Sequence, residues 1–163
     1  MLRIRRYESQ DYETVKALHF AGFDQHDMAH DIQEHSPYDV DIDNIEDVYL
    51  KGGDFLVGIL DGEIIAMGAI RKLSKIRAEI KRIRVRKDHQ RKGYGQIILK
   101  KLIEISGKKG FREICIDALV ENTAARHMFE KLQFTETHRG ELGPFNVIYY
   151  IKKLDGIDNT KGR

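Results

Sequence analysis

Two glycines and two cations stand close together in the segment QRKGYG, residues 90–95, between an alternating stretch, EIKRIRV, and a helix-like stretch, QIILKKLIEI. A strand that turns through such a loop into a helix gathers backbone N–H groups, the positive end of the helix dipole and nearby cations around one point. Gly93 and Gly95 permit positive φ angles and a close approach of a ligand, while Arg91 and Lys92 add charge. The segment therefore predicts a phosphate-binding turn.

Two common nucleotide-binding patterns fail on their residues. A Walker loop ends in Gly-Lys-Ser/Thr, but Gly95 is followed by Gln96 and Ile97, which leaves no lysine for the terminal phosphates and no hydroxyl for magnesium. A dinucleotide fingerprint requires a third glycine, which would fall at Ile98. ATP hydrolysis and NAD binding are therefore not expected.

Hydrophobic periodicity predicts the elements that position this turn. Alternating or β-branched runs indicate strands at residues 2–6, 54–60, 63–70, 78–86, 113–118, 134–138 and 145–152. Apolar residues at helical spacing indicate helices after a cap at Asp11, within residues 42–49, over residues 96–106 with an end at Gly107, and after a cap at Asn122. Asp61-Gly62 predicts a hairpin between the second and third strands.

The strand before the turn carries an irregular apolar pattern. Its apolar positions Ile80, Ile83 and Val85 are spaced by three and then two residues, so the alternation slips by one. One extra residue near Arg82 produces this slip, and the sequence therefore predicts a β-bulge there.

The order of elements, without an internal repeat or a linker, predicts a mixed α/β arrangement of the α+β class, with a largely antiparallel sheet and flanking helices. We expect a single domain over residues 1–154 and a flexible tail over residues 155–163. With 163 residues, 41% of them apolar and 33% charged, the composition excludes a disordered chain.

The N-terminus, MLRIRRYESQ, lacks the apolar core of a signal peptide, and no apolar run approaches the ~18 residues that span a bilayer. We therefore expect a cytoplasmic protein without a membrane partner. Cys115 is the only cysteine, so an internal disulfide is impossible, and its place in the apolar run ICI predicts a buried thiol rather than a reactive one.

A net charge of +2 conceals a strong sorting of charge along the chain. Residues 24–47 include nine Asp or Glu and no Lys or Arg, whereas residues 71–112 include sixteen Lys or Arg and three acids. Two sites of opposite preference, one for an anion and one for a cation, explain this split, and so do two solvated faces.

The spacing Gln-x-x-Gly-x-Gly after a bulged strand resembles the GNAT superfamily of acetyl-CoA-dependent N-acetyltransferases, in which this loop holds the pyrophosphate of CoA. Longer segments extend the resemblance in the family's order, namely IRRYESQDYETVKALH, IKRIRVRKDHQRKGYGQIILKKLIEISGKKGF and ICIDALVENTAARHMFEKLQF. It covers residues 2–152. It implies a GNAT-like sheet with a bulged, splayed strand, and acetyl-CoA as a co-substrate without a metal.

The resemblance also implies which residues hold acetyl-CoA. The free edge of the bulged strand, at Ile83, Arg84 and Val85, would hydrogen-bond the pantetheine arm as an extra strand. Asn122 matches a position that contacts the pantetheine, although a helix N-cap explains this residue equally well. The loop and the first helical turn would hold the pyrophosphate, through Gln90, Arg91, Lys92, Gly93, Tyr94, Gly95 and Gln96.

The implied reaction is direct attack of a neutral amine on the thioester, without an acyl-enzyme. It requires removal of an amine proton, stabilisation of an oxyanion and departure of a thiolate. By resemblance, Glu79 draws off the proton, often through water, and the backbone N–H of Ile83 stabilises the oxyanion. A surface ion pair with Arg77 or Lys81 is the alternative explanation of Glu79.

Phe129 departs from the family pattern, because many members carry a tyrosine at about this place to protonate the departing sulfur. The phenylalanine fits the apolar face of its own helix instead. A thiol pKa near ~8.5 lets the thiolate leave without a strong acid, and Tyr149 or Tyr150 is the available substitute.

Family members generally build the acceptor pocket from the region after the first helix and from the last hairpin. Here the first of these regions, residues 25–47, is acidic, which predicts a cationic acceptor such as a polyamine, an aminoglycoside, a lysine side chain or a peptide N-terminus. His26, His30 and His35 stand among these acids, but they form no His-Glu-x-x-His pattern and no third ligand is fixed, so no metal site is expected.

Two non-enzymatic interpretations stay open at the level of sequence. Phe129 favours an acyl-CoA sensor that has lost turnover. Arg82, Arg84 and Arg86 on one strand favour nucleic acid, but no aromatic stacking pattern accompanies them, so a nucleic-acid partner is not expected. A homodimer is compatible with the family, and the sequence does not identify the amine.

Overall fold

The computed structural model describes residues 1–24 and 39–155. Seven strands form one sheet in the order β1-β2-β3-β4-β5-β7-β6, and every neighbouring pair is antiparallel except β4 and β5. The strands are β1 (Arg3–Arg6), β2 (Asp54–Leu60), β3 (Glu63–Lys72), β4 (Arg77–Val85), β5 (Glu113–Leu119), β6 (Thr135–Leu142) and β7 (Phe145–Lys153). The predicted α+β class with a largely antiparallel sheet is confirmed.

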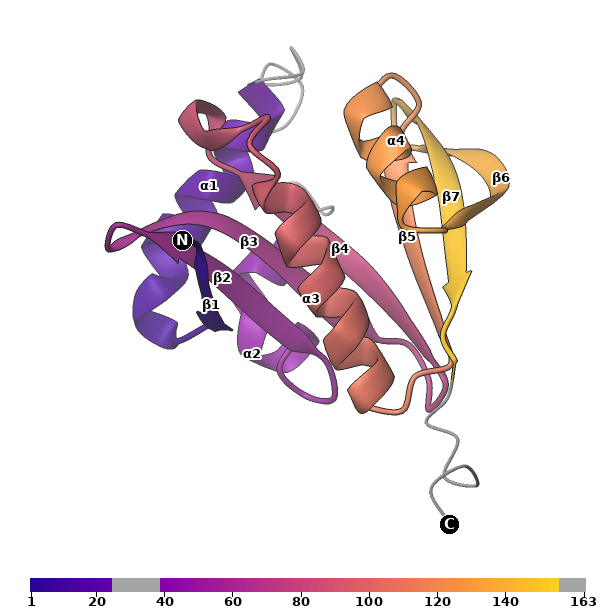
Figure 1. Cartoon of the computed structure of the whole chain (residues 1–163), viewed down its shortest axis with the longest axis horizontal. Coiled ribbons are helices and arrows are strands. Elements are labelled where there is room, and N and C mark those ends of the chain that lie inside the picture. The colour runs from indigo at the N-terminus through magenta and orange to yellow at the C-terminus, as the bar shows by residue number, and fades with distance from the viewer. Residues whose placement is uncertain (25–38, 156–163) are drawn as a thin grey trace.

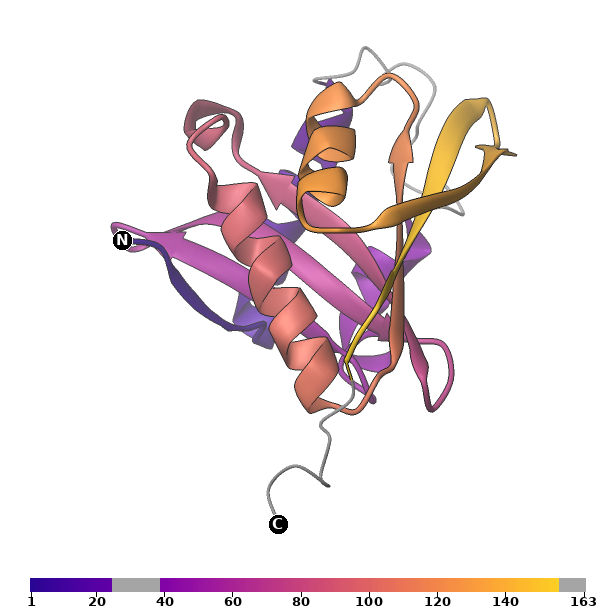
Figure 2. The same ribbon diagram turned by 45° about the vertical axis from the view of Figure 1, so that its right-hand side comes forward.

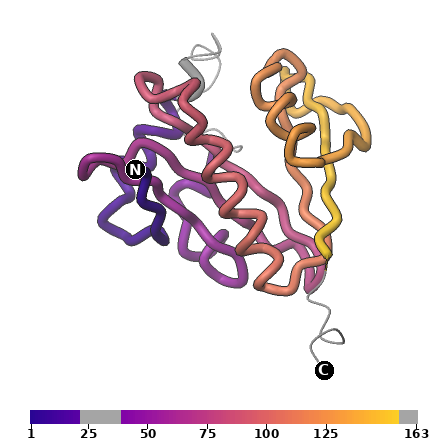
Figure 3. Tube along the Cα trace, viewed as in Figure 1, coloured from indigo at the N-terminus to yellow at the C-terminus, as the bar shows by residue number. Residues whose placement is uncertain are grey.

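Helices cover both faces of the sheet. The α-helices are α1 (Tyr12–Asp24), α2 (Ile45–Val48), α3 (Tyr94–Lys108) and α4 (Thr123–Lys131), and the 3-10 turns are η1 (Ser9–Asp11), η2 (Val40–Asn44) and η3 (Lys87–His89). Figures 1 and 2 show α3 and α4 over one face, above different halves of the sheet, with α1 and α2 behind the half that α3 covers. The tube in Figure 3 traces the same path.

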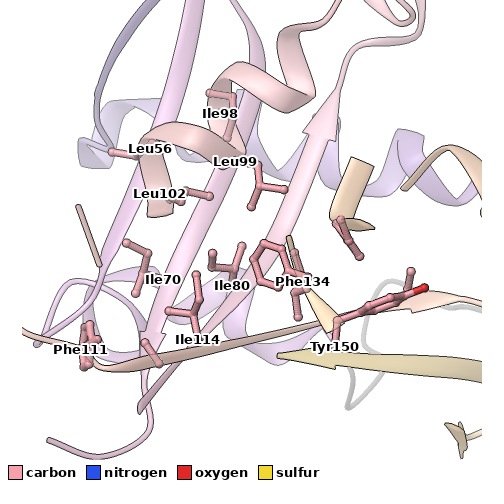
Figure 4. Close-up of a cluster of buried hydrophobic side chains, with 14 of the residues drawn as sticks. Leu56, Ile70, Ile80, Ile98, Leu99, Leu102, Phe111, Ile114, Phe134 and Tyr150 are labelled. Carbon is pink, nitrogen blue, oxygen red and sulfur yellow. The ribbon is translucent and has the colours of Figure 1, made fainter. Parts of the chain in front are cut away.

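Each face has its own apolar core. The first core packs α3 and α4 on the sheet and includes Ile80, Ile98, Leu102, Ile114 and Tyr150 (Figure 4). The second core packs α1, η2 and α2 on the other face, and its buried side chains include Val15, Ile42, Ile45, Tyr49 and Phe55. Leu56 of β2 lies in the first core and its neighbours Phe55 and Val57 lie in the second, as the pleat of a strand requires.

The ends of several elements differ from the prediction. α3 runs through Gly107 and ends near Gly110, whose φ of 91° suits the left-handed turn after a helix. β6 extends to Leu142, so only two residues form the turn before β7. Asp11 does not cap α1, because its carboxylate accepts the Glu8 N–H at 2.8 Å and binds Arg5.

Candidate active site

The two parallel strands pair only at their beginning. Arg77, Ala78 and Glu79 of β4 are registered with Glu113, Ile114 and Cys115 of β5, and the pairing stops there. Figure 1 shows the two ribbons meeting at one end of the sheet and diverging toward the other. Beyond Glu79, the side of β4 that faces β5 has no strand partner in the described sheet. The predicted splayed strand is present, and it is β4.

The predicted bulge lies within this diverging part of β4. Met67 of β3 pairs with Arg84 and Ala69 pairs with Lys81, so Gly68 alone faces both Arg82 and Ile83. Arg82 has a φ of 61°, which identifies the bulge type whose first residue is left-handed and is usually glycine. The bulge prediction near Arg82 is confirmed.

Gly68 lets α3 lie directly on the bulge. A Cβ atom at this position would lie 2.7 Å from Ile98 Cγ2 and 2.8 Å from Leu102 Cδ1, closer than side chains approach one another. The absence of a side chain at Gly68 therefore lets Ile98 and Leu102 of α3 pack on the backbone of β3 opposite the bulge.

The bulge directs the backbone groups of Ile83 and Val85 away from β3. The Arg86 N–H donates to Ile65 O of β3 at 2.7 Å, and alternate residues of a strand point their backbone groups to opposite sides. Two side chains of this chain bind the carbonyls on the open side. Arg84 Nη1 donates to Ile83 O, and Gln90 Nε2 donates to Val85 O, each at 3.0 Å.

The segment between β4 and α3 forms the predicted glycine turn. Gly93 precedes the helix with a φ of 87°, and no heavy atom lies within 4 Å of the place where its Cβ would stand. The first N–H groups of a helix have no intrahelical acceptor, and here no side chain at Gly93 caps them. A Cβ at Gly95 would lie 3.7 Å from Val85 Cγ2 and 3.9 Å from Met128 Sδ. The turn thus presents open backbone amides beside the end of β4.

Carboxylates of two strands flank the point where β4 and β5 part. Glu79 is half-buried and its Oε1 lies 3.2 Å from Nη2 of Arg71, so the ion pair formed here is with β3 and not with Arg77 or Lys81 as expected. Asp117 of β5 follows Cys115 by two residues and therefore lies on the same face of the strand as Cys115. The sequence prediction missed Asp117, whose only signal is its polarity within the apolar strand EICIDAL.

The comparisons with known proteins agree with this geometry. The sequence model described as "Acetyltransferase (GNAT) family" matches residues 13–134. The chain belongs to the acetyltransferase (GNAT) family. No curated protein sequence matches significantly.

Solved structures of GNAT-type acetyltransferases share the fold at low sequence identity. One from Staphylococcus aureus Mu50 superposes with a TM-score of 0.79 at 19% identity, over 95% of this chain and 100% of that one. The putative acetyltransferase yncA from Salmonella typhimurium, solved with acetyl-CoA, has a TM-score of 0.75 at 19% identity, over 95% of each chain. The ribosomal-protein-S18-alanine N-acetyltransferase from Escherichia coli has a TM-score of 0.71 at 19% identity, over 97% of this chain and 98% of that one.

The residues found at the open end of β4 fit the acetyl donor of this family, acetyl-CoA. A phosphate group can accept from the uncapped amides at Gly93 and the start of α3, and an amide-bearing arm can pair with the free side of β4. Asn122 caps α4, since its Oδ1 accepts the Ala125 N–H at 3.1 Å, so the N-cap explanation of this residue is confirmed.

Cys115 is not suited to nucleophilic catalysis. Burial, followed by the charge of Glu79, raises the pKa of its thiol, and Sγ lies 3.6 Å from Ala78 O. A thiol with a raised pKa carries little thiolate at neutral pH, which disfavours an acyl-enzyme at this residue.

Phe129, where the resemblance led us to look for a tyrosine, is a core residue. Phe129 is buried and meets the ring of Tyr150 edge-on, with ring centroids 5.4 Å apart. Tyr150 belongs to the same core beneath α4, whereas Tyr149 lies on the opposite face of β7, stacked on His138 at 4.4 Å. Burial, and then the charges of Asp117 and Glu79, raise the pKa of Tyr149, which makes it a weak acid.

Several described acids of the acidic segment have partners within this chain. Asp41 and Asp39 bind Arg82 and His19, the hydroxyl of Tyr12 donates to Asp43, and Asp47 pairs with Lys51. Asp39 and Asp41 are therefore occupied within the fold, and the cationic acceptor stays a prediction. The predicted metal candidates His26, His30 and His35 lie in residues 25–38, outside the described residues.

The described residues contain neither a potential metal cluster nor a membrane-spanning helix. Within residues 1–24 and 39–155, no three His, Cys, Asp or Glu side chains gather as a potential metal site. Among the helices of the same residues, none combines the length and the apolar character needed to cross a bilayer.

Proposed function

We propose that the protein transfers the acetyl group of acetyl-CoA to a primary amine by direct attack. The observation that carries this proposal is the conjunction, along β4, of two carboxylates where β5 leaves it, a free strand side beyond that point and a glycine turn into α3 after its end. Family membership supplies the acetyl donor, and the geometry supplies a place for each part of it.

The donor would lie along β4. Its pyrophosphate would accept from the amides of the turn at residues 91–96, and its pantetheine arm would pair with Ile83 and Val85. Arg84 Nη1 and Gln90 Nε2 now donate to the carbonyls of these two residues. Both hydrogen bonds would break when the pantetheine amides bind the same carbonyls. Asn122 would contact the same arm from α4.

The chemistry would take place where β4 and β5 part. Glu79, with Asp117 as a second carboxylate, would draw the proton from the attacking amine, and the Ile83 N–H would stabilise the oxyanion. Because the pKa of Tyr149 is raised and Phe129 has no proton to give, we propose that the thiolate leaves without a phenolic acid. A thiol pKa near ~8.5 makes this departure feasible.

The acceptor would be a cationic amine, as a small molecule or at the end or side of a peptide. Support for this class now comes from Glu79 and Asp117 rather than from the acids of η2, because an ammonium group is attracted to two carboxylates on one side of the sheet. The S18-alanine acetyltransferase among the structural neighbours acts on a protein alanine, which makes peptide N-termini one arm of the test.

Thiol release from acetyl-CoA, measured against a panel of polyamines, aminoglycosides and peptides, tests the proposal. We expect release with at least one amine, together with a product heavier by one acetyl group. Glu79→Gln should lower kcat by about a hundredfold, and Cys115→Ala should leave it unchanged. Binding of acetyl-CoA without release from any amine would instead support an acyl-CoA sensor, which the buried Phe129 favours.

Three expectations accompany this proposal and remain predictions. They are the single domain over residues 1–154, the cytoplasmic location and the homodimer. Limited proteolysis, localisation in cells and sedimentation equilibrium would test them in that order.

A further inference from the structure

An arginine occupies a backbone position that favours glycine. Arg82 is the left-handed residue of the bulge, with a φ of 61°, and this conformation is unfavourable for a residue with a Cβ atom. The bulge also sets the direction of the next N–H group, that of Ile83. Glycine would relax the backbone at this position, yet the chain has an arginine there.

The guanidinium of Arg82 is bound to a carboxylate of η2. Nε and Nη2 of Arg82 donate to the two oxygens of Asp41 at 2.8 and 2.6 Å, and only 11% and 13% of the two side chains are exposed. The hydroxyl of Tyr49, from the second core, also donates to Asp41. Burial opposes ionisation, but the bonds and charge of Arg82 outweigh it and hold the pKa of Asp41 at about 2. Asp41 is therefore charged at neutral pH.

A second buried pair extends the connection to α1. Arg82 Nη1 lies 3.8 Å from Asp39 Oδ1, which is 2.6 Å from Nε2 of His19 on α1. The side chains of His19 and Asp39 are 0% and 2% exposed. Through these contacts the bulge is attached to η2 and α1, which flank the segment between them in the chain.

We propose that the Arg82–Asp41 pair is a positioning device for the reaction, which fixes the bulge so that the Ile83 N–H points at the thioester oxygen. Arg82 and Asp41 touch neither donor nor acceptor in this proposal and act through the backbone of β4. The inference rests on the proposed function, because it assigns the oxyanion contact to Ile83. On the other face of the sheet, α3 lies against Gly68 and limits the bulge from that side.

Arg82→Gly and Asp41→Asn separate this role from simple stabilisation. Arg82→Gly keeps the left-handed backbone favourable while removing the anchor, and Asp41→Asn keeps the shape of the partner while removing its charge. The Arg5–Asp11 pair is a matched control, since it is also bidentate, at 2.7 and 2.9 Å, and joins β1 to η1. Asp11→Asn should lower stability without affecting the bulge of β4.

The direct readout is the infrared carbonyl band of acetyl-CoA labelled with carbon-13 at the thioester carbonyl, which requires no acceptor. On binding to the wild-type protein and to Asp11→Asn, we expect this band to move to lower frequency, because a hydrogen bond polarises the carbonyl. In Arg82→Gly and Asp41→Asn most of the shift should be lost, while the Kd for acetyl-CoA changes by less than about twofold. Arg82→Lys should give an intermediate shift, and it serves as the test if either other variant fails to fold.

Turnover with any accepted amine gives a second readout, in which kcat should fall about ten- to a hundredfold in Arg82→Gly and Asp41→Asn and stay constant in Asp11→Asn. A full carbonyl shift in both site variants would overturn the inference, as would a wild-type protein that binds acetyl-CoA without any shift. Failure of the wild-type protein to bind acetyl-CoA at all would instead overturn the proposed function.

Discussion

The two ends of β4 are held in place by different kinds of interaction. At its beginning, residues 77–79 pair with β3 or its turn on one side and with β5 on the other, so a backbone ladder holds them from both sides. At its end, residues 80–85 pair only with β3, and the chain departs from regular geometry at Arg82. At this end, side chains form the contacts on the strand: Arg82 donates to Asp41, and Gln90 donates to Val85 O.

This difference explains how one strand can be both rigid and open. A ladder on both sides would fix the backbone but leave no group for a ligand, whereas an unsupported edge would be free to pair but poorly placed. The Arg82–Asp41 pair beside the open edge holds the strand in position. The N–H groups of Ile83 and Val85 remain available to a ligand. Four variants test this division, in decreasing order of expected effect.

Gly93→Glu should cause the largest loss at the open end. It places a carboxylate among the amides that face the pyrophosphate and requires a φ of 87° from a non-glycine residue, so the Kd for acetyl-CoA should rise more than about a hundredfold. Gly110→Glu is the matched control, because Gly110 has a φ of 91° and equally open surroundings at the far end of α3. Calorimetric titration of both variants compares them, and equal losses would contradict the assignment of the turn.

Gly68→Ala should disturb the packing that limits the bulge. The added methyl would meet Ile98 and Leu102 of α3 at under 3 Å, so α3 must shift and the free energy of unfolding should fall by about 1–3 kcal/mol. Gly107→Ala, in α3 with no atom within 4 Å of the new methyl, should instead stabilise the protein by about 0.5–1 kcal/mol. Chemical denaturation of both variants would contradict this account if their effects had the same sign.

Asp41→Asn should lower stability by about 2 kcal/mol at neutral pH, because the folded-state pKa of Asp41, about 2, lies below its ordinary value of 3.8. A carboxyl with a depressed pKa stabilises the fold above its unfolded-state pKa, and this contribution is lost as the pH falls through the folded-state value. The difference from wild type should therefore shrink below about pH 4. Denaturation at neutral and acidic pH measures it, and a difference independent of pH would contradict the role of the charge.

Asp47→Asn provides the comparison for this effect. Asp47 pairs with Lys51, and both side chains are more than two-thirds exposed, so solvent screens the pair. We expect this variant to change stability much less than Asp41→Asn at every pH.

Gln90→Ala should have the smallest effect, and it should be favourable. Removal of the amide that now binds Val85 O frees this carbonyl for a pantetheine amide, and one exposed hydrogen bond corresponds to a change of about two- to fivefold in Kd. Pantetheine alone, without the nucleotide, is the probe, because it does not report on pyrophosphate contacts. Weaker binding of pantetheine by the variant would show that Gln90 contacts this arm directly.

The sequence predicts those parts of the fold that depend on local pattern. The slip from Ile80 to Ile83 located the bulge, and Asp61-Gly62 located the hairpin, where both residues have positive φ. Gly107 was wrong as the end of α3, because the helix includes Lys108 and the left-handed glycine that follows its end is Gly110.

Features that depend on the approach of distant segments could not be predicted from the sequence. The pairing of Arg82 with Asp41 joins residues 41 positions apart, and that of Glu79 with Arg71 depends on the register of two strands. Charge counts suggested a free acidic surface, but Asp41 binds Arg82 and Asp39 binds His19 within the fold. Asp117 becomes a candidate site residue only because the pairing of β4 with β5 ends two residues earlier, at Cys115.

Residue-resolved amide hydrogen exchange, measured with and without acetyl-CoA, tests the central claim most directly. We predict that the amides of Ile83 and Val85, and those of the turn at Gly93, exchange more slowly when acetyl-CoA is bound, while the amide of Glu79 does not change. Protection confined to other parts of the chain, with Ile83 and Val85 unaffected, would contradict the assignment of the open end of β4 as the acetyl-CoA site.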